Sequence, residues 1–418
     1  MLEIGKVRAD ELAKKFGTPL MAFDLTVMRS ILRRFTDNFK SDTLKTDIIY
    51  ASKAFNCKAM ISLIEEYGMC LDVVSAGELY TAQKAGYDCS KIYFHGNNKS
   101  IDEIKMALDC GVGTIVVDSL PEAELLSELT AGLTSPVRTL LRVNPGIDAH
   151  THKYIVTAHD DSKFGMLFSN EEEIVKTIRL LQKSPNIIFD GLDAHIGSQV
   201  FDKRAFIEEI RMMFEFAGLL KEKYEITSNS IDLGGGFATF YTDEDAPIPI
   251  DEVCQTIVQT CEEENEKIGG FINHILIEPG RSIAAAGSYT LYTAGFTKKT
   301  LNKNYVFIDG GMSDNIRPAL YQAKYRAFVA GKEAQTPIKK YTIAGKCCES
   351  GDILIEDLSL PQVDTGDILI IPATGAYCYS MASNYNKLQF PEVIFVEDGE
   401  ARVVIRRQTL DDLISREV

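Results

Sequence analysis

The chain has 418 residues, 45% hydrophobic and 25% charged, a composition typical of a globular protein with room for two domains. Its formal net charge of −16 argues against nucleic acid or an anionic membrane as a partner, because both attract basic surfaces. No apolar run approaches the roughly 18 residues of a membrane span, and the charged N-terminus lacks a signal peptide's apolar core. The nine cysteines follow no repeated spacing, so we expect no disulfide framework and a reducing cytoplasm.

Short β-branched runs alternate with amphipathic helical stretches from about residue 45 to residue 280. Before them, the first 25 residues contain one expected strand at 18–24, and this segment could join either domain. The alternation predicts eight strands, at 47–52, 70–75, 91–96, 113–119, 138–145, 189–197, 230–236 and 274–280. Near-continuous apolar strands separated by helices indicate parallel βαβ units, and eight of them match a (β/α)8 TIM-like barrel. A doubly wound open sheet is the competing topology.

The alternation of strand-like and helical segments ends after residue 280. Strand-like runs with turn residues between them predict an all-β domain from about 280 to 408, followed by a short helical tail. The long irregular segment 146–165 follows the fifth barrel strand, where a lid over the site is expected.

Polar residues gather at the expected C-terminal ends of the barrel strands, where barrel enzymes place their catalytic groups. Lys53 follows the first strand, and a partly buried, neutral lysine can form a Schiff base. An isolated lysine is more often simply salt-bridged. Asp72 on the second strand could orient Lys53 or cap the strand. His95, Asn97, Arg142 and Asn144 stand at similar positions on the third and fifth strands.

The sequence also offers a phosphate site. The run Gly234–Gly236 follows the seventh strand and EPGRS follows the eighth, the two places from which barrel phosphate sites usually come. A phosphate beside a Schiff-base lysine suggests pyridoxal phosphate, which needs an acid opposite its ring nitrogen. Glu278 is the candidate, although it could instead pair with Arg281. His195 could stack on the cofactor ring or be an ordinary core histidine, and Ser198 could donate to the phosphate.

Two adjacent thiols, Cys347 and Cys348, lie in AGKCCESGD. Neighbouring side chains on a strand point to opposite faces, and zinc sites usually use a CxxC spacing with four ligands. We therefore expect no metal site here.

These residues together resemble those of the fold-type III pyridoxal-phosphate-dependent decarboxylases, and among them the members that act on meso-2,6-diaminopimelate. The matching segments cover most of the chain: YASKA, RVNPGIDAHTHKY, DSKFGM, HIGSQ, LGGGF, EPGRS, CESGD and GAYCYSMASNYN. The resemblance implies an alanine-racemase-like fold, with a pyridoxal-phosphate-binding barrel at 26–280 and a β-rich domain formed by 1–25 and 281–418. It further implies a homodimer with shared active sites, and decarboxylation to L-lysine and CO2 as the last step of lysine biosynthesis.

The resemblance also implies roles for individual residues. The catalytic residues would be Lys53, which binds the cofactor covalently, His195, which stacks on its ring, and Cys348, which protonates the product. The remaining cofactor contacts would come from Asp72, Ser198, Gly235, Gly236, Glu278, Gly280, Arg281 and Tyr377. Substrate would be held by Arg281, Arg317, Tyr321 and Tyr377, and by Glu349 from the partner subunit.

Three other readings are open at this stage. A decarboxylase of the same fold could act on ornithine, arginine or carboxynorspermidine, but two arginines favour a substrate with a distal carboxylate. A non-catalytic cofactor-binding homologue should have lost Lys53 or Cys348. A cofactor-free barrel could bind a sugar phosphate through its glycine-rich turns.

Overall fold

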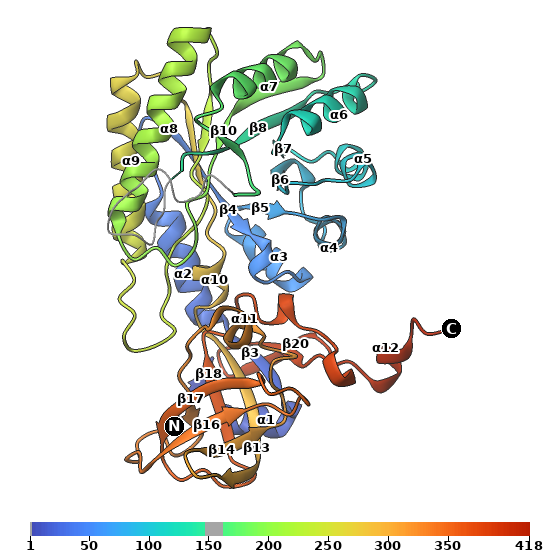
Figure 1. The fold of residues 1–418 in the computed structure, drawn as a ribbon, viewed down its shortest axis with the longest axis vertical. Coiled ribbons are helices and arrows are strands. Elements are labelled where there is room, and N and C mark those ends of the chain that lie inside the picture. Colours follow the sequence, from blue (N-terminus) through green and yellow to red (C-terminus); the bar gives the residue numbers. More distant parts are fainter. Residues whose placement is uncertain (1, 147–161) are drawn as a thin grey trace. The chain divides into compact units, whose positions relative to one another are not determined.

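The computed structural model describes residues 2–146 and 162–418, and most of the expected lid at 146–165 lies outside them. The chain divides into two compact units (Figure 1). The barrel unit comprises residues 32–238 and 247–280, and the β unit comprises residues 1–31, 239–246 and 281–418. Against the predicted domain bounds, residues 26–31 and 239–246 fall in the β unit rather than in the barrel.

The barrel unit is a closed ring of eight parallel strands, which excludes the open-sheet alternative. The strands pair in the order β10-β11-β12-β4-β5-β6-β7-β8. The ring is closed because β10 pairs with both β11 and β8. The strands are β4 (Lys45–Ala51), β5 (Cys70–Val73), β6 (Ile92–Phe94), β7 (Thr114–Val117), β8 (Val137–Asn144), β10 (Ile187–Asp193), β11 (Ser230–Asp232) and β12 (His274–Ile277). The short β9 (Met166–Leu167) pairs with the end of β8. Each expected barrel strand is confirmed within a few residues.

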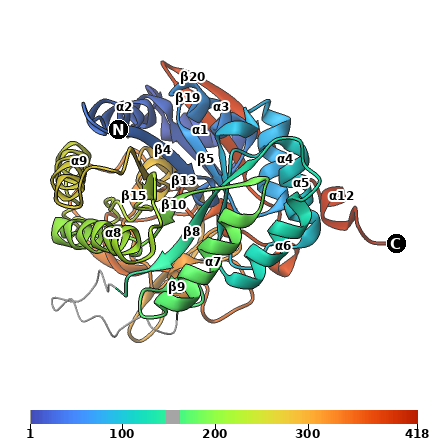
Figure 2. The ribbon, with the colours of Figure 1, turned by 90° about the horizontal axis from the view of Figure 1, so that it is seen from above.

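Helices surround these strands, as Figure 2 shows from above for α4 to α9. They are α3 (Lys58–Glu66), α4 (Ala76–Ala85), α5 (Ile101–Cys110), α6 (Leu120–Thr130), α7 (Glu171–Lys183), α8 (Lys203–Tyr224) and α9 (Ile250–Lys267). α4, α5 and α6 begin at Ser75, Ser100 and Ser119, each of which accepts a hydrogen bond from the backbone N–H three residues on. This serine cap satisfies a donor that the helix itself leaves unpaired, so each strand-to-helix turn is fixed locally.

The β unit is built on a sheet of order β17-β16-β14-β13-β3-β19-β20; β18 also pairs with β13, and β15 pairs with β18. Its strands are β1 (Glu3–Ile4), β2 (Val7–Arg8), β3 (Leu20–Asp24), β13 (Ser288–Lys299), β14 (Asn304–Ile308), β15 (Phe328–Val329), β16 (Lys339–Ala344), β17 (Ile353–Leu360), β18 (Ile368–Pro372), β19 (Glu392–Glu397) and β20 (Glu400–Ile405). Its short helices are α1 (Ala9–Phe16), α10 (Arg281–Ala284), α11 (Arg317–Tyr321) and α12 (Leu410–Ile414), and α2 (Leu25–Asn38) leads into the barrel unit. The buried side chains of Leu20, Leu291, Ile370 and Ile394 form part of its core.

Among the described residues, no helix is both long and apolar enough to cross a membrane. The nine cysteines all lie in the described part of the chain and are present as reduced thiols.

Candidate active site

Lys53 directly follows β4, and Asp72 lies on the neighbouring strand β5, at the C-terminal end of the barrel. β4 ends in the 3-10 turn η1 (Ser52–Ala54), which carries Lys53, and its Nζ is 3.8 Å from Oδ2 of Asp72 on β5. The Lys53 side chain is 44% exposed, whereas that of Asp72 is 1% exposed. Burial raises the pKa of Asp72, and the nearby charges of His95 and Lys53 only partly oppose it. The Lys53 side chain is thus partly covered and partly open to solvent.

Glu278 forms a buried ion pair directly after β12. Its Oε1 is 2.8 Å from Nε2 of His95, and both side chains are at most 10% exposed. Burial alone would raise the pKa of Glu278, but His95, Lys53 and Arg142 outweigh it and hold that pKa well below its usual range. In return, Glu278 and Asp72 raise the pKa of His95 against the effect of burial. Glu278 is therefore a fixed negative charge at neutral pH.

Two further carboxyl groups, Asp193 and Asp232, crowd against Glu278. Oxygen atoms of the three residues lie within 4.8 Å of one another, and all three are buried. Burial raises the pKa of Asp193 to about 6 and that of Asp232 well above its usual range. Of the three groups, Glu278 has the lowest pKa and stays ionised, whereas the raised pKa of Asp232 favours its protonated form. Arg142 Nη1 contacts Asp193 Oδ1 at 2.7 Å.

The sequence reasoning missed Asp193 and Asp232. The alternation of side chains along a strand could have indicated them. Asp193 stands two residues before His195, and Asp232 two residues before Gly234, so each shares the inward face with a residue that was singled out.

His195 follows β10 and is only partly exposed. Burial, together with the positive charges of Arg142 and Lys53, lowers its pKa to about 3. The backbone N–H of Gly235 donates to His195 Nδ1 at 3.1 Å. The imidazole is therefore neutral at physiological pH, which suits stacking against an aromatic ring.

The turn after β11 brings bare backbone close to the neighbouring strand end. Gly234 and Gly236 have φ values of +63° and +98°, which disfavour any residue with a side chain. A Cβ on Gly235 would lie 2.5 Å from the carbonyl oxygen of Glu278, and one on Gly280 would lie 2.8 Å from the Cβ of Ala51. Such side-chain-free backbone is what a phosphate needs to reach N–H groups. Ser198 is partly exposed in the loop after β10.

In the β unit, Arg281 and Arg317 are surrounded by tyrosines. Arg281 Nη1 donates to the hydroxyl of Tyr241 at 2.9 Å, and its guanidinium lies 4.7 Å from the ring centre of Tyr377. Arg317 is 7% exposed, donates to the hydroxyl of Tyr325 at 2.5 Å, and lies 4.8 Å from the ring centre of Tyr241. The shared Tyr241 ring therefore links the two guanidinium groups. Tyr241 and Tyr325 were not singled out from the sequence.

The other expected substrate residues of the β unit are exposed. Tyr321, at the end of α11, is 61% exposed, and Glu349 also faces solvent. The two adjacent thiols differ: Cys348 is exposed, whereas Cys347 is 8% exposed. Burial and the neighbouring Asp352 raise the pKa of the Cys347 thiol to about 11. Cys348 is therefore the accessible thiol of the pair.

The barrel residues fit pyridoxal phosphate. Lys53 offers an amine on a partly exposed side chain, Glu278 a charged carboxylate for a protonated ring nitrogen, and His195 a neutral ring to stack. The glycine turns offer backbone for the phosphate. Fold and site together define a barrel enzyme that works with pyridoxal phosphate.

Comparison with known proteins agrees with this class. Residues 28–285 match the family described as "Pyridoxal-dependent decarboxylase, pyridoxal binding domain". The chain is 46% identical over 414 residues to the diaminopimelate decarboxylase of Bacillus subtilis, covering 99% of this chain and 94% of that protein. It is 46% identical over 407 residues to the enzyme of the same name from Staphylococcus aureus, covering 96% and 94%. A crystal structure of diaminopimelate decarboxylase from M. jannaschii superposes with a TM-score of 0.92 at 31% identity, covering 100% and 97% of the two chains.

The chain therefore belongs to the diaminopimelate decarboxylase family of pyridoxal-dependent decarboxylases. Its cofactor is pyridoxal phosphate.

Proposed function

We propose that this protein decarboxylates meso-2,6-diaminopimelate to L-lysine and CO2, the last step of lysine biosynthesis. The observation that carries the proposal is the pair of tyrosine-flanked guanidinium groups, Arg281 and Arg317, in a member of this family. Two planar forks suit the distal carboxylate that diaminopimelate has and ornithine lacks. In agreement, relatives from M. jannaschii and Helicobacter pylori have been crystallised with L-lysine.

When bound, pyridoxal phosphate withdraws electrons from the substrate's α-carbon and so allows the α-carboxylate to leave as CO2. In this proposal Lys53 would hold the cofactor through its amine, and Asp72 would orient the lysine. Glu278 keeps a proton at the ring nitrogen, because its own pKa is held low and it remains charged. His195 stacks on the ring as a neutral imidazole.

The other residues bind the two ends of the reacting pair. The backbone of Gly235, Gly236 and Gly280, with Ser198, binds the cofactor phosphate, and Tyr377 contacts the cofactor and substrate. Arg281 contacts the phosphate as well as the substrate. Arg317, Tyr321 and Glu349 hold the substrate's distal end.

Cys348 supplies the proton that replaces the lost carboxylate. Its exposure supports this assignment, since a proton donor to a diffusing substrate must be accessible, and the buried Cys347 is not. The thiol gives its proton to the substrate's α-carbon and is reprotonated by solvent.

The proposal includes a cytoplasmic homodimer in which Cys348 and Glu349 serve the active site of the partner subunit. Mixing inactive Lys53→Ala and Cys348→Ala chains under conditions of subunit exchange should then restore turnover, because one mixed site contains both native residues. Mixtures as inactive as the separate variants would refute the shared site.

A substrate panel tests the function itself. The holoenzyme should release CO2 from meso-2,6-diaminopimelate and form L-lysine in equal amount. Ornithine, arginine and lysine should be at least a hundred-fold poorer substrates in kcat/KM. A site built for a distal carboxylate leaves its buried charges unpaired when the substrate lacks that carboxylate. Faster release from ornithine or arginine would assign the chain to another decarboxylase of the same fold.

A further inference from the structure

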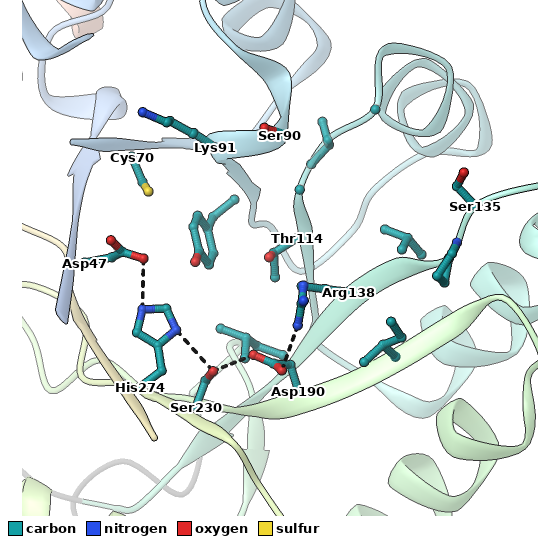
Figure 3. A pocket seen from close by; sticks show the side chains of 18 of the residues that line it. Asp47, Cys70, Ser90, Lys91, Thr114, Ser135, Arg138, Asp190, Ser230 and His274 are labelled. Atoms are coloured by element: carbon teal, nitrogen blue, oxygen red, sulfur yellow. Dashed lines mark hydrogen bonds and ion pairs between the residues drawn. The ribbon is translucent and has the colours of Figure 1, made fainter. Parts of the chain in front are cut away.

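The barrel has a cavity of about 1080 Å3 at the N-terminal ends of its strands, opposite the end that carries Lys53 (Figure 3). That volume is slightly above the roughly 300–1,000 Å3 typical of small-molecule sites. Six of the eight strands each turn a polar side chain into it: Asp47, Thr114, Arg138, Asp190, Ser230 and His274. Barrel interiors are usually filled by bulky branched side chains, so an open polar ring at this end is unusual.

An apolar layer separates this cavity from the catalytic end. On β12, His274 faces the cavity, Leu276 stands two residues on, and Glu278 two further, so the three occupy successive layers of the same inward face. Leu276 packs with Ile49 and Cys70 in a small buried cluster. The cavity is therefore a site apart from the residues described above.

Its polar side chains are held in place by one another. Asp47 Oδ2 lies 3.0 Å from His274 Nε2, and His274 Nδ1 lies 3.3 Å from Ser230 Oγ (Figure 3). Ser230 donates to Asp190, and Arg138 Nη1 contacts Asp190 Oδ1 at 3.1 Å. The chain of contacts runs across β4, β12, β11, β10 and β8, which orders the wall before any ligand arrives.

The order Asp47, His274, Ser230 superficially matches a hydrolytic triad. Ser230 is 1% exposed, however, and its hydroxyl proton is given to Asp190. A nucleophile must donate its proton to the histidine, and Ser230 donates to Asp190 instead. The arrangement of Asp47, His274 and Ser230 therefore suits ligand binding and not hydrolysis.

Charges of both signs line the cavity. Three cations and three acids contribute, namely Lys45, Lys91, Arg138, Asp47, Asp109 and Asp190. Burial would raise the pKa of Asp47, but His274 and Lys45 outweigh it and lower that pKa, so the carboxylate is ionised at neutral pH. Arg138 is 57% exposed and contacts Asp190 through Nη1, which leaves other guanidinium N–H groups for a ligand. Figure 3 shows Asp47 and Arg138 on opposite sides of the cavity.

We infer that this cavity binds a small zwitterion, an α-amino acid whose carboxylate is held by Arg138 and Lys91 and whose ammonium group is held by Asp47. The cations and acids of the wall are equal in number and partly paired, Lys45 with Asp47 at 2.5 Å and Arg138 with Asp190 at 3.1 Å. A ligand of one sign would unbalance this wall, whereas a zwitterion would not, and an apolar ligand would desolvate it without compensation. Hydroxyl groups such as that of Thr114 line the remaining wall and suit a polar amino-acid side chain. The inferred zwitterion site is argued from the residues that line the cavity. Only the choice of L-lysine as the first ligand to test rests on the proposed function.

The test is equilibrium dialysis of the holoenzyme with L-lysine. Arg138→Gln should bind one equivalent fewer per chain than the wild type, with roughly ten-fold or greater loss of affinity at that site. Arg204→Gln, an exposed arginine on α8 that also pairs with an aspartate, is the matched control and should bind as the wild type does. Lys91→Gln, at an exposed position, should weaken the same site if Arg138→Gln proves unstable.

Two lysine derivatives separate the charges. L-lysine methyl ester lacks the carboxylate and Nα-acetyl-L-lysine lacks the α-ammonium group, and both should lose binding at this site. Equal stoichiometry in Arg138→Gln and wild type, or undiminished binding of both derivatives at the site, would overturn the inference. Turnover of meso-2,6-diaminopimelate, measured without added lysine, should be unchanged in Arg138→Gln, so a failed decarboxylase assay and an empty cavity are distinguishable results.

Discussion

Replacing Tyr325 with phenylalanine should weaken substrate binding without disabling the chemistry. The Tyr325 hydroxyl accepts a hydrogen bond from Arg317 at 2.5 Å, and the two side chains are 4% and 7% exposed. Because water does not replace a partner at so buried a position, the variant leaves one guanidinium N–H unsatisfied. In the proposed function Arg317 grips the substrate's distal carboxylate, so Tyr325 is a positioning residue for that grip.

The magnitude follows from the charge on Arg317. A hydrogen bond to a charged group contributes about 1.5–3 kcal/mol, which corresponds to roughly ten-fold to a hundred-fold in affinity. Arg317 keeps its contact with the ring of Tyr241 at 4.8 Å, which limits its displacement. We therefore expect the lower end of that range of affinity loss. The KM for meso-2,6-diaminopimelate should rise roughly ten-fold, and kcat should change by less than about three-fold.

The assay is steady-state CO2 release over a range of substrate concentrations. Tyr341→Phe is the matched control, since Tyr341 is also buried and its hydroxyl contacts Gln362 and the backbone of Val363, both at 3.3 Å, away from any arginine. Both variants should lose stability, but only Tyr325→Phe should raise KM. An unchanged KM in a folded Tyr325→Phe enzyme, or an equal rise in both variants, would refute the positioning argument.

Three further predictions concern the remaining site residues. Cys348→Ala should lose most turnover while retaining cofactor absorbance, whereas the buried Cys347→Ala should remain active; equal losses would reverse the choice of thiol. Glu278→Gln removes the fixed charge beside the ring nitrogen and should lower kcat by roughly ten-fold or more, with the cofactor still attached, and an unchanged kcat would exclude that role. The pKa of His195 falls from 6.5 to about 3 on folding, so its contribution to stability is complete above about pH 6.5 and is lost as the pH falls towards 3. In urea titrations, His195→Gln should therefore flatten the acid-side fall in the free energy of unfolding, and an identical fall in both proteins would contradict the lowered pKa.

Much of the barrel could be predicted because its strands are buried on both faces and read as continuous apolar runs. The β unit was harder. β17, with the sequence ILIEDLSL, mixes acidic and apolar residues without strict alternation, so its bounds cannot be predicted from the pattern. The short α1, eight residues long, was missed, since a helix of that length is held by its packing on the sheet core more than by its own pattern.

The active site divides in the same way. Lys53 and Glu278 could be found because strand ends are legible in the sequence. The ion pair between His95 and Glu278 could not, since it joins residues 183 positions apart in sequence, the difference between 278 and 95. The distribution of protons among Asp193, Asp232 and Glu278 depends on burial and mutual distance, which no spacing in the sequence reveals.

The central claim is that Lys53, at the end of β4, carries the cofactor beside Asp72 and Glu278. Borohydride reduction of the holoenzyme, followed by proteolysis and mass spectrometry of the peptides, tests it most directly. We predict a single pyridoxyl modification, on the peptide that contains Lys53, and none when substrate and borohydride are added to Lys53→Ala. Modification of a different lysine in the native enzyme would contradict the account.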